Sequence, residues 1–256
     1  MISTEIIILC TGAFAAGFID AIIGGGGLIQ TPVTLITLPQ YPVATLLGTT
    51  KIPSISGTSI AAVQYSLKVK IKWRLMLLMC GIALSAAFTG SKLVSITSNS
   101  FMKPVIFCML VLVAIYTYTK KDFGMAASKD MGSRKEFLYG AVFALLVGFY
   151  DGFIGPGAGS FMVLFFISIL GFDFLKASAH SKIVNVSTNL GSIIFFSIQG
   201  RILYQYALPM AACNFAGSFL GSRLAILKGN RFIRIFFLLV IAATILRFGY
   251  DIFIKK

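Results

Sequence analysis

Apolar residues run along this chain in long, nearly uncharged stretches separated by short polar connections. Leu75–Ser91 and Pro104–Thr119, for example, contain no Asp, Glu, Lys or Arg. A helix needs about 20 consecutive apolar residues to cross the hydrocarbon core of a bilayer, and most of these stretches approach that length. The pattern therefore predicts an all-α polytopic membrane protein. The predicted helical segments cover residues 4–22, 26–38, 42–66, 73–92, 102–119, 136–154, 158–170, 174–198, 203–223 and 232–253.

The composition supports a membrane protein and indicates which partners to expect. The chain has 256 residues, of which 57% are hydrophobic and 12% are charged, about half the charged share of a soluble domain. Its net charge of +14 comes from Lys and Arg in the short connections, where cytoplasmic loops and lipid headgroups account for them. The lipid bilayer is thus a predicted partner and nucleic acid is not. The four cysteines lack metal-ligand spacing, so no metal and no cofactor is predicted.

The chain divides into two similar halves. The polar segment 120–135 is rich in Lys and Arg, which predicts a cytoplasmic linker between a first transmembrane repeat, 1–119, and a second, 136–256. Asp151 follows Asp20 by 131 positions (151 − 20), and the same offset aligns further polar and glycine positions without a gap. Internal repeats in a polytopic membrane protein are typical of transporters, with the substrate site where the halves meet.

The relative orientation of the halves is less clear from sequence. If segments 26–38 and 158–170 cross the membrane, each half has five passes and the second half is inverted. If they re-enter instead, each half has four passes and the repeats are parallel. The positive-inside rule gives nearly equal support to both. We favour inverted repeats, because inversion brings two broken helices together at the bilayer midplane.

Each half contains an aspartate in apolar sequence, followed four positions later by a glycine-rich break. A break in a membrane helix leaves backbone N–H and C=O groups that only protein or a watery cavity can satisfy. The helix that follows it presents an N-terminus, which favours anions. Close helix packing through small residues is the structural alternative. The predicted substrate-binding residues of the breaks are Gly24, Gly25, Gly26, Gly27, Gly155 and Gly157, with Asp20 and Asp151 as ion-pair or proton-coupling residues.

A second set of polar residues lies deep in two predicted helices. Lys51 and Lys182 are each about ten residues from a helix start, which is roughly mid-bilayer, and a buried lysine there pairs with a carboxylate or binds an anion. A structural pair within each half, Lys51 with Asp20 or Lys182 with Asp151, is the alternative. The other candidates for the substrate site are Thr49, His180, Asn185 and Asn189.

These other candidates also leave two interpretations open. His180 is the only histidine of the chain, and we consider it as a substrate donor or proton carrier, with a hydrogen-bonded helix residue as the alternative. The spacing of Lys182, Asn185 and Asn189 places them on one helix face. That face lines a polar lumen, or it forms interhelical hydrogen bonds.

The chain resembles the sulfite exporter TauE/SafE family, also called the toluene sulfonate uptake permease family. The resemblance is carried by Gly17–Pro32, by Gly148–Ser160 and by Ala177–Asn185, and it extends over essentially the whole chain. It implies a multi-pass transporter of the bacterial plasma (inner) membrane. It also implies that the substrate is sulfite, a sulfonate or another small sulfur-containing anion.

The sequence therefore predicts a secondary transporter of a small anion that works by alternating access. Coupling to protons through Asp20 or Asp151 and a homo-oligomeric state are left open. A passive anion channel is the first alternative. An intramembrane aspartyl hydrolase is the second, although the matched lysines favour ionised carboxylates over a pair that shares one proton. We predict no catalytic residue.

Overall fold

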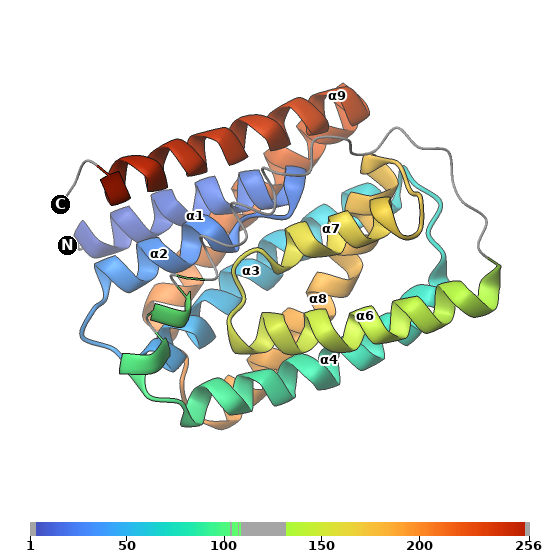
Figure 1. Ribbon diagram of the computed structural model, residues 1–256. Coiled ribbons are helices and arrows are strands. Elements are labelled where there is room, and N and C mark those ends of the chain that lie inside the picture. The colour runs from blue at the N-terminus through green and yellow to red at the C-terminus, as the bar shows by residue number, and fades with distance from the viewer. Residues whose placement is uncertain (1–3, 103, 107, 109–131, 254–256) are drawn as a thin grey trace.

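The computed structural model describes residues 4–102, 104–106, 108 and 132–253, and of residues 230–253 it describes the backbone alone. All regular secondary structure in this part of the chain is helical (Figure 1). The helices are α1 (Thr4–Ile23), α2 (Gly27–Thr37), α3 (Val43–Ser66), α4 (Trp73–Ile96), α6 (Ser133–Phe153), α7 (Ala158–Ser168), α8 (Phe174–Ile198) and α9 (Tyr204–Phe253). Helix α9 is interrupted at Gly229, whose φ of 69° and ψ of −168° are not helical.

The helices agree closely with the predicted segments. The short helices after the glycine breaks, predicted at 26–38 and 158–170, are α2 and α7. The predicted helix 102–119 and the predicted linker 120–135 fall mostly outside the described residues, and α6 already begins at Ser133. Apolar stretches bounded by glycine and charged residues define helix ends well, because a helix in lipid ends where its apolar surface ends.

The protein is a multi-pass membrane protein. Within the described residues, four helices are long and apolar enough to cross a bilayer: α1, α4, α6 and the part of α9 from Tyr204 to Gly229. Helices α3 and α8 have 24 and 25 residues and are also long enough to cross, but they carry buried polar side chains. They pack against each other and are enclosed by α4, α7 and α9. The polar helices are therefore shielded from lipid by apolar ones.

The first helix of each half packs against the fourth helix of the other half, α1 against α9 and α6 against α4. Glycines permit this close approach. A Cβ on Gly152 would lie 2.0 Å from the carbonyl oxygen of Ala87, and a Cβ on Gly217 would lie 2.1 Å from that of Phe14. Small residues are the usual means of close packing between membrane helices, because apolar side chains gain little by leaving lipid. The described helices of segments 1–119 and 136–256 are therefore interleaved rather than side by side.

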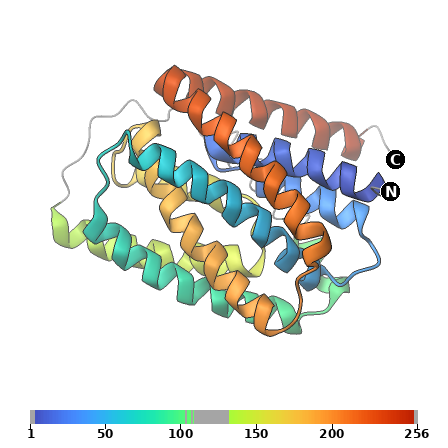
Figure 2. The same cartoon turned by 180° about the vertical axis from the view of Figure 1, so that it is seen from behind.

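The helices of the two halves begin at equivalent positions and run in opposite directions. The starts of α2, α3 and α4 precede those of α7, α8 and α9 by 131 positions each (158 − 27, 174 − 43 and 204 − 73). In Figure 1, α1 leaves the end of the molecule that holds the N-terminus, whereas α6 runs toward that end; α3 and α8 are opposed likewise, as are α4 and the first part of α9. Figure 2 gives the same directions from behind. This arrangement favours inverted over parallel repeats, and the side that faces the cytoplasm stays a prediction.

Two apolar clusters include residues that adjoin the glycine breaks. One contains Ile23, Met162 and Phe166, and the other contains Leu47 and Ile154. Each cluster thus draws residues from both halves. Residues at the ends of α1 and α6 and at the start of α7 (Ile23, Ile154 and Ala158) are buried members of these clusters, which hold the breaks in the interior.

Candidate substrate site

The two glycine breaks meet inside the molecule. A Cβ on Gly24 would lie 2.5 Å from the carbonyl carbon of Gly159, and a Cβ on Gly27 would lie 3.1 Å from Cα of Pro156. Gly24 has φ +82° and its repeat mate Gly155 has φ +90°, a left-handed conformation that glycine adopts without strain. The two breaks are therefore in close backbone contact, as the sequence predicted.

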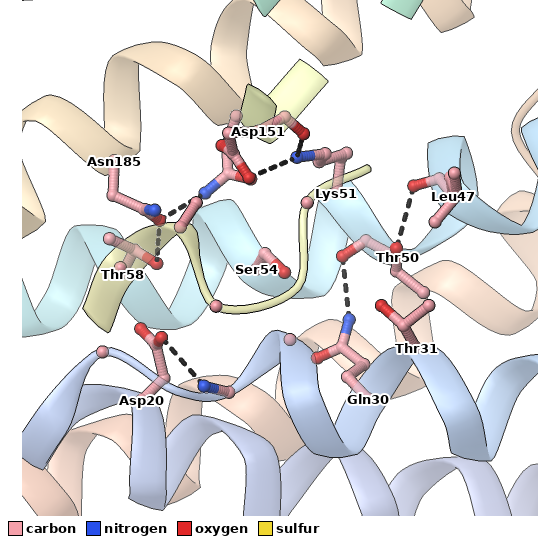
Figure 3. A pocket seen from close by; sticks show the side chains of 18 of the residues that line it. Asp20, Gln30, Thr31, Leu47, Thr50, Lys51, Ser54, Thr58, Asp151 and Asn185 are labelled. Carbon is pink, nitrogen blue, oxygen red and sulfur yellow. Dashed lines mark hydrogen bonds and ion pairs between the residues drawn. The ribbon is translucent and has the colours of Figure 1, made fainter. Parts of the chain in front are cut away.

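A small cavity lies where the breaks meet. It encloses about 50 Å³, and since one water needs about 10–15 Å³ measured in this way, it has room for a few waters or one small anion. The wall is formed by the breaks and by parts of α1, α2, α3, α6, α7, α8 and α9 (Figure 3). Its polar side chains are Asp20, Gln30, Thr31, Thr50, Lys51, Ser54, Thr58, Asp151, Asn185, Asn189 and Asn214.

Two ion pairs cross between the halves at this cavity. Lys51 Nζ lies 3.0 Å from Asp151 Oδ1 and donates a 2.8 Å hydrogen bond to the Asp151 backbone oxygen. Lys182 Nζ lies 2.6 Å from Asp20 Oδ2 and also donates to the Asp20 backbone oxygen. The alternative pairings, Lys51 with Asp20 and Lys182 with Asp151, are wrong, because the interleaved helices place each lysine beside the acid of the other half.

The lysines also neutralise the negative charge at the C-terminal ends of the broken helices α1 and α6. Asp20 and Asp151 lie in the last turns of α1 and α6, where the helix dipole disfavours negative charge and carbonyl oxygens lack helical partners. Each lysine bonds both the carboxylate and the carbonyl of its aspartate. A positive charge is therefore built into each break from the opposite half.

The two pairs differ in what they present to the cavity. Lys51 lines the cavity, whereas Lys182 lies behind Asp20 with a side chain only 1% exposed. Both carboxylate oxygens of Asp20 have partners, since Oδ1 accepts a 3.2 Å hydrogen bond from the Gly26 N–H and Oδ2 accepts from Lys182. Lys51 is therefore the one lysine among the lining residues.

Amide side chains complete the polar wall. Asn214 Nδ2 donates to Gln30 Oε1 (2.9 Å), and Gln30 Nε2 donates to the Thr50 carbonyl oxygen (2.8 Å). On the facing side, Asn189 Nδ2 donates to Asn185 Oδ1 (2.9 Å). These bonds fix the amides of α2, α8 and α9 in place around the cavity, so the polar groups are ordered before any ligand binds.

The structure brings most of the predicted site residues together. Residues on the cavity wall are Asp20, Gly24, Gly26, Gly27, Lys51, Asp151, Gly155, Gly157, Asn185 and Asn189. Those outside it are Gly25, Thr49, His180 and Lys182.

Thr49 and His180 have the same structural role in their respective halves. Thr49 Oγ1 donates to the Thr45 carbonyl (2.7 Å) and accepts from the Leu203 N–H (3.1 Å). His180 Nδ1 bonds the Lys176 carbonyl (2.7 Å), while Nε2 accepts from the Lys72 N–H (3.1 Å). Each side chain thus ties its helix to the residue just before the start of the fourth helix of the other half. These hydrogen bonds favour the structural alternative for His180, which does not line the cavity, and its role at the substrate stays a prediction.

Replacing His180 by alanine is expected to lower Tm without changing anion affinity. The side chain is fully buried, and a lost hydrogen bond that strands the Lys72 N–H costs roughly 1–3 kcal/mol. Thermal unfolding and anion binding of the purified variant measure the two effects, with Thr49→Val as the matched change in the other half. Weakened binding at unchanged Tm would contradict the structural role.

The predicted site lacks six polar lining residues: Thr50, Ser54 and Thr58, and three whose repeat mates are unlike them, Gln30, Thr31 and Asn214. The offset of 131 relates the last three to Phe161, Met162 and Ala83, so the repeat gave no signal there. A polar residue just after a glycine break is the signal that could have found Gln30 and Thr31. By contrast, the offset relates Ser54 to Asn185 and Thr58 to Asn189, and all four line the cavity.

Comparison with known proteins identifies relatives over most of the chain. The family model described as "Sulfite exporter TauE/SafE" matches residues 9–248. The "Probable membrane transporter protein ORF9" of Sinorhizobium sp is 34% identical over 244 residues, which are 95% of this chain and 92% of the relative. The "Probable membrane transporter protein" of Haemophilus influenzae is 35% identical over 230 residues, 89% of this chain and 88% of the relative.

A third relative is the "Probable membrane transporter protein YfcA" of Escherichia coli. It is 31% identical over 243 residues, which are 93% of this chain and 87% of the relative. No solved structure matches the chain. The relatives are bacterial and match nearly full length, in keeping with a multi-pass protein of a bacterial membrane.

Proposed function

Because the chain belongs to the sulfite exporter TauE/SafE family of membrane transporters, we propose that it carries a small anion across the bacterial plasma membrane by alternating access. Sulfite, a small sulfonate or a related organosulfur anion is the proposed substrate. The observation that carries this proposal is the cavity between the two glycine breaks, where Lys51 lines the wall. The proposal rests on the chemistry of that wall and on the family.

The wall has the groups that an anion needs. The starts of α2 and α7 adjoin the cavity, and the N-terminal end of a helix carries a partial positive charge. Some N–H groups there already have partners, since Gly26 donates to Asp20 Oδ1 and Ala158 to the Gly155 carbonyl oxygen. Lys51 brings a positive charge, which Asp151 balances at 3.0 Å in this structure. Amide and hydroxyl groups of Asn214, Asn189 and Thr31 add hydrogen-bonding capacity. A volume of about 50 Å³ suits an anion the size of sulfite better than an aromatic sulfonate.

The position of the cavity supports alternating access. Transporters with repeated halves bind substrate near the midplane, between discontinuous helices, and rocking of one half against the other exposes the site to each side in turn. Here the cavity lies between two broken helices, one from each half. The ion pairs that cross between the halves are contacts that such a movement would remake.

The two rival functions fit these observations less well. An aspartyl hydrolase needs two carboxylates that share acid and base duty, but each aspartate here bonds a lysine. A passive channel needs a continuous path, whereas the cavity is small and is flanked by apolar clusters.

Uptake into proteoliposomes tests the proposal. Purified protein is expected to give saturable uptake of labelled sulfite, which small sulfonates inhibit and benzenesulfonate inhibits weakly. With a second ion gradient imposed, a carrier accumulates the anion above its outside concentration, and protein-free liposomes are the control. Equilibration without accumulation under every imposed gradient would favour a channel, and no uptake of any small anion would refute anion transport.

A further inference from the structure

The two acid–lysine pairs have the same residues at repeat-related positions, but one of them is incomplete. Asp20 accepts hydrogen bonds on both carboxylate oxygens. Asp151 is 4% exposed, its Oδ1 bonds Lys51, and its Oδ2 is buried without a hydrogen-bond partner in the described part of the chain. This difference is not visible in the sequence, where the two aspartates have the same setting.

A buried carboxylate oxygen without a partner has a physical consequence. Leaving a buried polar atom unsatisfied costs about 1–3 kcal/mol, and more when the group is charged. A proton on Asp151 Oδ2 removes the charge and with it most of the desolvation cost. A metal cation is a poorer occupant, because the Lys51 ammonium lies 3.0 Å from Oδ1 and the described residues contain no group of three acidic, His or Cys side chains.

The charged surroundings of Asp151 are few. Lys51 faces it from α3, Asp20 lines the same cavity from α1, and Lys182 of α8 is already bonded to Asp20. On α6 itself, the Tyr150 hydroxyl donates to the Pro156 carbonyl (2.6 Å). Helices α4 and α7 also pack on α6 but contribute no ionisable side chain to the cavity. Lys51 is therefore the charge that a change at Asp151 affects most directly.

We propose that Asp151 is the site of the coupling proton and that its protonation on Oδ2 frees the charge of Lys51 for the anion. The inference rests on the proposed anion transport. A proton from the aqueous phase forms the O–H bond on Oδ2, and the carboxylate becomes a neutral acid. Lys51 stays protonated and remains bonded to the Asp151 backbone oxygen. The cavity gains one positive charge, which one monovalent anion balances, and proton and anion leave together on the other side.

The second pair has a different role under this proposal. The Asp20–Lys182 pair stays intact through the cycle, because both carboxylate oxygens of Asp20 are hydrogen-bonded and Lys182 does not reach the cavity wall. Their pair holds α1 against α8 in every state. The repeat thus supplies one pair for coupling and one for structure from the same two residue types.

Asp151→Asn, which imitates the protonated acid, tests the proposal against the matched change Asp20→Asn. Wild-type proteoliposomes are expected to accumulate sulfite about tenfold per unit of imposed pH gradient at equilibrium. Asp151→Asn should lose this accumulation but retain exchange of internal for external anion. Asp20→Asn should be less stable and slower, yet its remaining uptake should still follow the pH gradient.

The possible outcomes distinguish failure of anion transport itself from failure of the assignment of the coupling proton to Asp151. Wild-type protein that moves no anion under any gradient refutes the proposed function. Wild-type accumulation that Asp151→Asn retains, or that Asp20→Asn loses selectively, overturns the assignment to Asp151. If Asp151→Asn does not fold, proton uptake by the wild-type protein decides. When sulfite is added to weakly buffered protein, the protein should take up about one proton per bound anion. An absence of proton uptake overturns the proposal.

Discussion

Alanine at position 51 is expected to abolish anion uptake and to destabilise the protein, whereas alanine at the exposed Lys70 changes neither. Lys51 is buried, lines the cavity and bonds Asp151 at 3.0 Å. Removing one partner of a buried pair costs about 3–5 kcal/mol, because it leaves an uncompensated charge. The anion loses its charged partner as well, so initial rates in proteoliposomes should fall by at least about 100-fold.

A double variant separates binding from folding. Lys51→Ala with Asp151→Asn removes the stranded carboxylate together with the lysine, so much of the lost Tm should return while uptake stays absent. Purified protein gives Tm, and the same preparation gives the uptake rate. Near-normal uptake by the double variant would show that Lys51 acts only through folding.

Alanine at Gly24 is expected to destabilise the protein strongly. Gly24 has φ +82°, and an added Cβ would lie 2.5 Å from the backbone of Gly159. Backbone strain and a clash with main-chain atoms together cost about 3 kcal/mol or more, which lowers Tm by about 10 °C in a chain of this size. Thermal unfolding of the purified variant measures the change.

Gly81 offers the matched control for this substitution. It lies within α4, and a Cβ added there meets no atom within 4 Å, so Gly81→Ala should be neutral or stabilising by up to about 1 kcal/mol. Equal Tm values for Gly24→Ala and Gly81→Ala would contradict the close contact between the two breaks.

Much of the helical framework could be predicted from sequence, since hydropathy and glycine punctuation determine where membrane helices begin and end. The helix predicted at 158–170 is α7, Ala158–Ser168, and the one predicted at 174–198 is α8, Phe174–Ile198. The spacing of Lys182, Asn185 and Asn189 also indicated a polar face of one helix, and Asn185 and Asn189 line the cavity.

The pairing of charges could not be predicted in the same way. Proximity along the chain suggested a pair of Lys51 with Asp20, which is wrong, because the packing of α3 against the second half places Lys51 beside Asp151. The hydrogen bonds of His180 could not be predicted for a related reason. Its partners, the Lys72 N–H and the Lys176 carbonyl, are backbone groups that no residue type reveals.

Asymmetry between the halves is the other feature that sequence repeats conceal. Gln30 and Asn214 line the cavity, although their repeat mates are Phe161 and Ala83. A search for matched residues finds what the halves share and passes over what makes them different. The same holds for hydrogen bonding: both carboxylate oxygens of Asp20 have a partner, whereas Asp151 Oδ2 has none in the described part of the chain, and the repeat does not reveal this difference. The oligomeric state stays a prediction.

Ligand-protected labelling at position 54 tests the account most directly, because Ser54 lines the cavity and is partly exposed. Ser54→Cys is made in a background in which Cys10, Cys80, Cys108 and Cys213 are serine, with transport checked first. A small charged thiol reagent should modify Cys at this position, and saturating sulfite should slow the modification severalfold. Labelling at an unchanged rate in the presence of sulfite, in protein that transports it, would place the anion elsewhere.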